Sequence, residues 1–161
     1  MVVFHGEALK LTINRWGETA VFIMTTIDVK SASYRIAYFI SPHGYGHAAR
    51  ASAVMQALHE LDSKIRFEIF TKVPRWFFEQ SLVGAFGYHS LLTDIGLAQK
   101  TPLLEDLPET IRRLEKLLPF EASHMAELAH LLHRLECQLV ICDIAAMGIA
   151  VAVTWMAKDR A

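Results

Sequence analysis

The stretch "RIAYFISPHGYGHAARASAVMQALHE", Arg35–Glu60, decides the fold that the sequence predicts. Its first residues are apolar and rich in aromatic and branched side chains, which is typical of a buried strand. Two glycines flanked by two histidines then interrupt the run. From His47 to Leu61 apolar residues recur every three or four positions, as on one face of a helix. The stretch therefore predicts a strand, a glycine turn and a helix in direct succession.

The rest of the chain continues this alternation. The further expected strands are Ile65–Thr71, Gly87–Leu92 and Gln138–Asp143. The further expected helices are a short one from Pro74 through Leu82, a long one over Pro108–Glu136 broken near Pro119, and one from about Met147. A loop, "TDIGLAQKTPLLEDLPET", starts at Thr93. Strands that alternate with helices indicate an α/β fold, with a Rossmann-like parallel sheet flanked by helices.

The chain is long enough for one domain with its own core. In residues 1–33 the apolar residues recur with no clear period, and we expect this segment to form an irregular N-terminal extension. A small hairpin, an unstructured segment and translation from a start codon placed too far upstream are all compatible with this part. The regular domain is expected to occupy residues 34–161.

Composition excludes several classes of protein. The net charge is −1 and the basic residues are scattered, so the concentrated basic face that nucleic acid requires is absent. Cys137 and Cys142 lack the spacing of a zinc or redox motif and indicate free thiols in a reducing cytoplasm. The apolar run Leu139–Ala157 contains Asp143 and Gly148, which favours a strand, a turn and a helix over a membrane span. A hydrophobic fraction of 53% indicates elements buried on both faces or an apolar surface that meets a partner.

The glycine turn is the main candidate for a binding site. Ligands of parallel sheets bind beyond the carboxyl ends of the strands, which is where Ser41 to His47 is expected. Gly44 and Gly46 permit close approach to the backbone, and the following helix offers N–H groups and its positive dipole to a phosphate or carboxylate. The plainer alternative is that the two glycines only make a tight turn.

Phosphate-binding motifs separate into three cases. No lysine follows the glycines, so a P-loop is excluded. Gly44, Gly46 and Ala49 match the dinucleotide fingerprint, but Thr71 and Lys72 stand where that motif needs an acidic residue. A dinucleotide-binding oxidoreductase therefore remains an alternative. The third case is a nucleotide-sugar transferase.

Polar residues around the turn are candidates for chemistry. His43 and His47 flank glycines and so cannot form the helical histidine pair of a zinc protease, and we expect no metal site. His47, at the start of the helix, could act as acid, base or hydrogen-bond donor, or merely cap or pack. Arg50 could pair with a phosphate or with a buried carboxylate such as Asp143. Asp143 ends a buried strand at the same edge, where it could contact a ligand or cap the next helix.

Two further groups of polar residues complete the set. Asp94 and Gln99 in "TDIGLAQ" could project to the same edge as the turn. The three histidines of the long helix (His124, His130 and His133) are expected on a solvated face.

These residues also carry a resemblance. "ISPHGYGHAARASAV" resembles the "GHGFGHATR" motif of the glycosyltransferase-like segment of plant L-arabinokinases and of bacterial proteins of the GT-B type. "LLTDIGLAQKTPLLEDLPET" is similar to that family's "D-x-G-x-x-Q" loop, and "LVICDIAAMGIAVA" to its "D-F-V-V-S-D" strand and helix. The likeness covers Tyr34 to Ala152. It departs from the family at Ser41-Pro42, where a second glycine is usual, and at Ala49, where threonine is usual.

The resemblance implies the N-terminal, acceptor-side half of a GT-B glycosyltransferase. Such enzymes transfer sugar from a nucleotide-sugar, a co-substrate rather than a bound cofactor, to a hydroxyl acceptor, usually without metal. It implies His47 as the catalytic residue, and it implies a cleft lined by His43, Gly44, Tyr45, Gly46, Arg50, Asp94, Gln99 and Asp143.

The end of the chain departs from the family, because "VTWMAKDRA" does not follow its continuation. The resemblance therefore implies a C-terminally truncated domain, from a fragment or a frameshifted gene, that lacks the donor-binding half and is inactive alone. A separate C-terminal domain or subunit is a possible partner. A non-catalytic module that binds sugar or nucleotide, or pairs with another subunit, is the other alternative.

Overall fold

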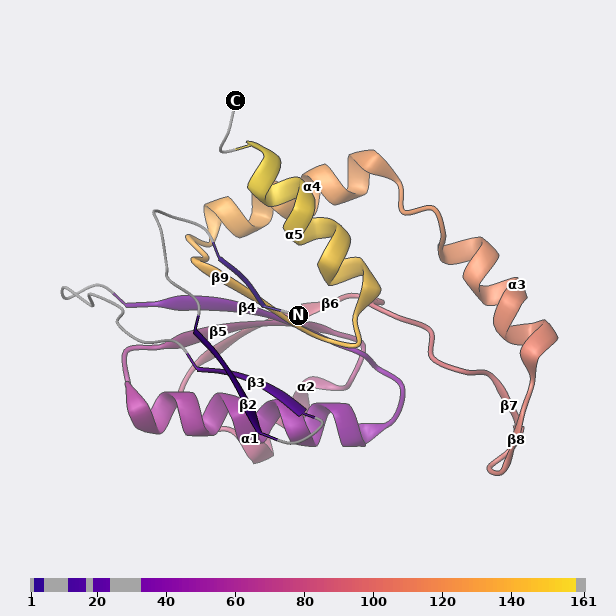
Figure 1. The fold of residues 1–161 in the computed structure, drawn as a ribbon, viewed down its shortest axis with the longest axis horizontal. Helices are drawn as coiled ribbons and strands as arrows, with labels where there is room; N and C mark the ends of the chain where they lie inside the picture. The colour runs from indigo at the N-terminus through magenta and orange to yellow at the C-terminus, as the bar shows by residue number, and fades with distance from the viewer. Residues whose placement is uncertain (1, 5–11, 17–18, 24–32, 159–161) are drawn as a thin grey trace.

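The computed structural model describes residues 2–4, 12–16, 19–23 and 33–158. Its centre is a five-stranded sheet in the order β1-β9-β4-β5-β6 (Figure 1). Strands β9, β4, β5 and β6 run parallel, and β1 pairs antiparallel with β9 at the edge. The strands are β1 Val2–Phe4, β4 Arg35–Ile40, β5 Arg66–Thr71, β6 Phe86–Ser90 and β9 Leu139–Asp143. The predicted α/β, Rossmann-like fold is confirmed.

Helices cover both faces of this sheet (Figure 1). On one face lie α1 (Tyr45–Leu61) and α2 (Arg75–Ser81), and on the other lie α4 (Ala122–Arg134) and α5 (Ala146–Lys158). A further helix, α3 (Leu107–Leu117), lies off the sheet beyond its right-hand end in Figure 1. Within the described part of the chain, no helix is both long and apolar enough to cross a membrane.

The long predicted helix is two helices, broken where a proline was expected to break it. Helix α3 begins after Asp106, whose side chain accepts a hydrogen bond from the Glu109 backbone N–H at 3.0 Å. It ends at Leu117, before the cis Leu118–Pro119 bond, and α4 begins at Ala122. Proline has no N–H to continue a helix, which accounts for the break.

Two small hairpins lie outside the sheet. In the N-terminal part, β2 (Thr12–Trp16) pairs antiparallel with β3 (Thr19–Ile23). These two strands correspond to the small hairpin that was one of the alternatives for this segment. The rest of residues 1–33 lies largely outside the described residues. The segment predicted as a loop contains the hairpin of β7 (Gln99–Thr101) and β8 (Leu104–Glu105). These strands have two or three residues and no alternating apolar pattern, so the sequence carries no signal for them.

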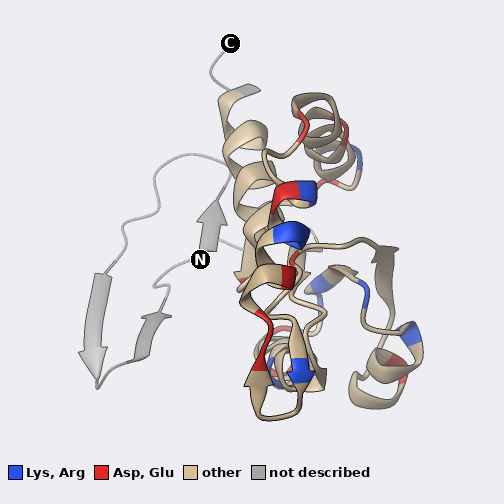
Figure 2. Ribbon diagram, turned by 90° about the vertical axis from the view of Figure 1, so that its right-hand side faces the viewer, with Lys and Arg blue, Asp and Glu red and all other residues tan. Residues whose placement is uncertain are grey.

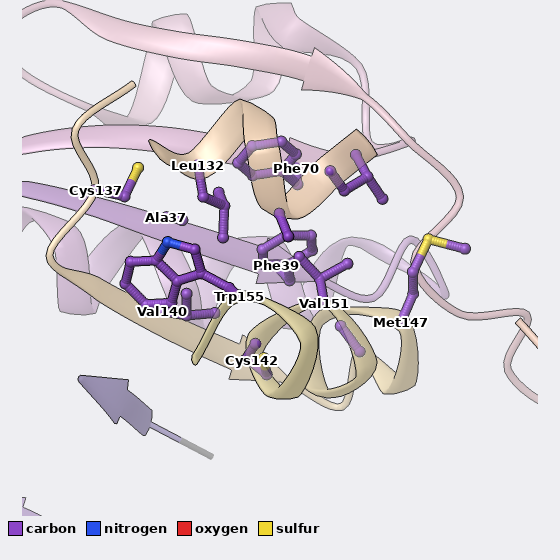
Figure 3. Packing of buried hydrophobic residues seen from close by; sticks show 14 of the residues in the cluster. Ala37, Phe39, Phe70, Leu132, Cys137, Val140, Cys142, Met147, Val151 and Trp155 are labelled. Atoms are coloured by element: carbon purple, nitrogen blue, oxygen red, sulfur yellow. The ribbon is translucent and has the colours of Figure 1, made fainter. Parts of the chain in front are cut away.

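The core under α4 and α5 fixes the sheet (Figure 3). Ala37 and Phe39 of β4 point to this face, and the Phe39 ring stacks on Phe70 of β5 at 4.5 Å between centroids. Trp155 of α5 is completely buried against them. Each large buried side chain contributes roughly 1.5–3 kcal/mol from the hydrophobic effect. This packing holds the strand ends, and with them the candidate site, in fixed positions.

A buried charged side chain lies in the middle of β5. Glu68 of β5 is buried, and its Oε2 lies 2.8 Å from His89 Nε2 on the neighbouring strand β6. Arg35 Nη1 is 3.8 Å from Glu68 Oε1. Burial of a carboxylate requires such partners, because an unpaired buried charge is strongly unfavourable.

Candidate functional site

The candidate site lies at the carboxyl edge of the parallel strands, at the right-hand end of the sheet in Figure 1, on the side that faces the viewer in Figure 2. Ser41, directly after β4, donates its backbone N–H to the Asp143 carbonyl at the end of β9 at 3.1 Å. Thr93, after β6, donates its hydroxyl to the Ile40 carbonyl at 2.6 Å. These bonds hold three chain segments side by side around the glycine turn.

The turn itself is open on its outer side. Gly44 has φ +78°, a backbone conformation that favours glycine, and it is the N-cap of α1. A Cβ added at Gly44 or Gly46 would meet no atom within 4 Å. Gly44 has no side chain that could cap the first turn of α1. A ligand could therefore reach this backbone without displacing a side chain.

Three charged or ionisable side chains meet next to the turn. Arg50 donates from Nε to Asp143 Oδ2 at 3.3 Å and also from Nη2 to Asp143 Oδ1. His47 Nδ1 lies 3.4 Å from Asp143 Oδ1 and 3.1 Å from Arg50 Nη2. The Asp143 side chain is 10% exposed, whereas those of His47 and Arg50 are 23% and 60% exposed. The pairing of Arg50 with Asp143 is one of the two alternatives that the sequence left open.

His47 Nδ1 has two neighbours with opposite requirements. Asp143 needs a proton on Nδ1, whereas Arg50 needs the lone pair of that nitrogen. The 3.1 Å separation from Arg50 is an ordinary hydrogen-bond length, and the 3.4 Å separation from Asp143 is long. The shorter contact matches the tautomer with its proton on Nε2, which can donate to a ligand, and the longer contact is within reach of the tautomer with its proton on Nδ1. If Arg50 leaves, Asp143 can accept from Nδ1, and Nε2 can act as a base.

The same ion pair affects the groups around it. The side-chain hydrogen bond to Asp143, followed by the charge of that carboxylate, raises the pKa of Arg50. Burial, and next the Asp143 charge, raise the pKa of Tyr38 in β4 to about 12. Tyr38 is therefore a neutral, buried support under the site.

Asp94 and His43 form a second part of the edge. Asp94 Oδ2 accepts from the Ser41 hydroxyl at 3.0 Å and from the Gly96 N–H at 3.1 Å. The His43 ring packs on Gly96, where an added Cβ would lie 2.2 Å from His43 Cγ. Gly96 also has φ +59°, so both its conformation and this contact require glycine.

The structure does not bring Gln99 to this group. Gln99 is exposed in β7 and pairs with Glu105 of β8, in the hairpin beyond the sheet (Figure 1). Tyr45 does lie at the turn, half-exposed, and its ring stacks on Phe77 of α2 at 5.3 Å between centroids. Trp76, also half-exposed, lies 6.1 Å from the Tyr45 ring. The sequence placed Trp76 in a helix without assigning it a role at the site.

Among the residues that the structure describes, no three His, Cys, Asp or Glu side chains could together hold a metal ion. On α4, His130 is exposed, while His124 and His133 are half-buried. The His133 ring lies 5.9 Å from that of Trp155.

Comparison with known proteins gives no assignment: no protein-family model, no curated protein sequence and no solved structure matches this chain. The resemblance to the glycosyltransferase family therefore rests on the three motifs quoted above. The site offers one histidine of adjustable tautomer, one exposed guanidinium, an open helix start and an exposed aromatic surface.

Proposed function

We propose that this chain supplies the acceptor side of a glycosyltransferase-like protein, which transfers a sugar from a nucleotide-sugar donor to a hydroxyl acceptor. The observation that carries the proposal is the cluster of His47, Arg50 and Asp143 beside the open glycine turn. Sugar transfer to a hydroxyl needs a base for the acceptor proton and positive groups for the departing phosphate.

In this proposal His47 receives the proton of the acceptor hydroxyl at Nε2. Asp143 accepts a hydrogen bond from Nδ1–H and stabilises the imidazolium that forms, so it is a positioning residue. Arg50 must first leave Nδ1, and the phosphate of the donor offers it an alternative anionic partner. Tyr45 and Trp76 add apolar ring faces next to the turn, against which the C–H face of a sugar could stack.

Nuclear magnetic resonance of the purified protein tests the state of His47. Long-range ¹H–¹⁵N spectra report which ring nitrogen carries the proton. We expect the proton on Nε2 in the native protein and a shift towards Nδ1 in Arg50→Ala, because Asp143 then becomes the partner of Nδ1. The double variant Arg50→Ala/Asp143→Asn should lose that shift. An unchanged tautomer in Arg50→Ala would refute the assigned roles.

Ligand titrations test the class of function. Methyl glycosides should perturb the signals of Tyr45 and His47, and UDP should perturb those of the glycine turn. Tight binding of NADPH would instead favour the dinucleotide-binding alternative. The non-catalytic binding module has one observation in its favour, the 3.1 Å contact that engages His47 Nδ1 with Arg50. That alternative predicts sugar binding with no change of the His47 tautomer when UDP is added.

A further inference from the structure

A cleft of about 380 Å³ adjoins the glycine turn, between the segment after β6 and helix α3. Its volume falls in the range of small-molecule sites. Much of its lining is apolar and comes from Pro42, Leu92, Ile95 and Leu117. His47, Arg50 and Asp143 are not part of this lining, so the cleft is distinct from their cluster.

Helix α3 contributes a basic wall. Arg113 and Lys116 line the cleft and are three residues apart, hence on one face of the helix. Over its whole length α3 carries three basic and two acidic residues, and its basic bands are visible in Figure 2. Arg113 Nε donates to Glu109 at 2.9 Å. A guanidinium has five N–H donors, so this bond leaves others for a ligand.

Hydrogen-bonding groups of the turn and of the segment after β6 also line the cleft. Asp94 and His43 line the cleft there. Asp94 Oδ2 is already engaged by the Ser41 hydroxyl and the Gly96 N–H. A ligand anion would be repelled from this carboxylate and attracted to the α3 side. The lining thus combines apolar side chains, two cationic side chains of α3 and the hydrogen-bond acceptor Asp94.

We propose that this cleft binds a small amphipathic organic anion. Arg113 and Lys116 hold its carboxylate or phosphate monoester, its apolar body lies on Leu92, Ile95 and Leu117, and a hydroxyl of the ligand can donate to Asp94. This inference goes beyond the proposed sugar transfer. The cleft shares His43 and Asp94 with the set that the resemblance implies, but the anion is held by Arg113 and Lys116, which have no role in the proposed transfer.

The test uses three probes of similar size on ¹⁵N-labelled protein: benzoate, phenyl phosphate and neutral benzyl alcohol. Benzoate or phenyl phosphate should shift the amide signals of the cleft, and benzyl alcohol should bind more weakly. The variant Arg113→Gln/Lys116→Gln should weaken anion binding about tenfold or more, since charge-assisted hydrogen bonds are lost. Arg112→Gln is the matched control, because Arg112 has the same charge on the same helix and also pairs with Glu109.

Each outcome decides the inference. Preference for benzoate or for phenyl phosphate identifies the anionic group, and either supports the proposal. Equal weakening by Arg112→Gln would show general attraction to a basic helix and overturn it. Equal binding of benzyl alcohol, or no shift of the cleft signals with any probe, would also overturn it. Retained amide dispersion in the variants shows that they are folded, as expected for exposed side chains.

Discussion

Replacement of Arg50 by alanine tests the central ion pair of the candidate site. Arg50 makes two hydrogen bonds to the Asp143 carboxylate, and its removal leaves that carboxylate with His47 Nδ1 as its remaining partner at 3.4 Å. Because the Asp143 side chain is only 10% exposed, water cannot fully replace the guanidinium. We expect the variant to fold but to be less stable.

The magnitude follows from the exposure of the two partners. Hydrogen bonds to charged groups contribute roughly 1.5–3 kcal/mol when sheltered from solvent, whereas fully exposed ion pairs contribute about 0–1 kcal/mol. Arg50 is 60% exposed and Asp143 is 10% exposed, so the pair falls between these limits. We expect Arg50→Ala to lower the free energy of unfolding by about 1–2 kcal/mol. For a chain of this length that corresponds to a decrease in Tm of roughly 2–8 °C.

Urea unfolding followed by circular dichroism measures this free energy. A double-mutant cycle with Asp143→Asn isolates the interaction of the pair, which should be about 1–2 kcal/mol. The control is Arg112→Ala: the Arg112 side chain is 67% exposed in its pair with Glu109, and its loss should change stability by less than about 0.5 kcal/mol.

A coupling energy below about 0.5 kcal/mol would refute the reasoning, because the Asp143 carboxylate would then not need the guanidinium of Arg50 as a partner. An equal effect of Arg112→Ala would also refute it, since the partly buried carboxylate would have no special role. Weakening of the coupling in high salt is expected, because one partner faces solvent.

Three further predictions concern the supports of the site. Gly96→Ala should destabilise by at least about 1–2 kcal/mol in urea unfolding, since φ is +59° and the added Cβ would overlap an imidazole; Gly46→Ala, where nothing lies within 4 Å of the added Cβ, should not destabilise. Trp155→Ala should cost about 3–5 kcal/mol, because the side chain is completely buried. Trp155→Phe should cost less in the same urea unfolding experiments, and equal losses would contradict the packing argument. Burial raises the pKa of Cys137 to about 12 and that of Cys142 to about 11 from an ordinary value of 9.0. These thiols ionise first in the unfolded chain, so stability should be complete below pH 9 and fall as pH rises towards 11–12. The urea midpoint at pH 8 and pH 10 measures this, and a double Cys→Ala variant should show a flatter dependence.

Many of the residues at the carboxyl edge of the sheet could be predicted from the sequence, because the direction of the parallel strands determines which residues lie there. The apolar run Arg35–Ile40 ends at the glycine turn, and the apolar run before Asp143 ends at the same side of a parallel sheet. Any polar residue that follows such a run is therefore placed at that edge. Arg50 lies in the second turn of the helix that starts at this edge, so the strand order and the helix start together predict Arg50 as a partner of Asp143.

The positions of the other site residues depend on the angles between helices, strands and hairpins, which a sequence pattern does not encode. Asp94 and Gln99 are five residues apart, yet a hydrogen bond to Ser41 holds Asp94 at the edge while a short hairpin carries Gln99 away. Arg113 and Lys116 reach the cleft only through the direction in which α3 leaves that hairpin. Likewise, the burial of Glu68 is explained by its strand neighbour His89, which only the β5–β6 register reveals.

The two carboxylates of the edge are stabilised in different ways, and this difference matters for an incoming anion. Asp94 accepts bonds from a hydroxyl and a backbone N–H, which are fixed in place. Asp143 depends on Arg50, whose exposed side chain can move. An anion bound near the turn can therefore attract Arg50 without disturbing Asp94. The proposed base would then form only when an anionic substrate is present, since Asp143 becomes able to accept from His47 Nδ1 at that moment.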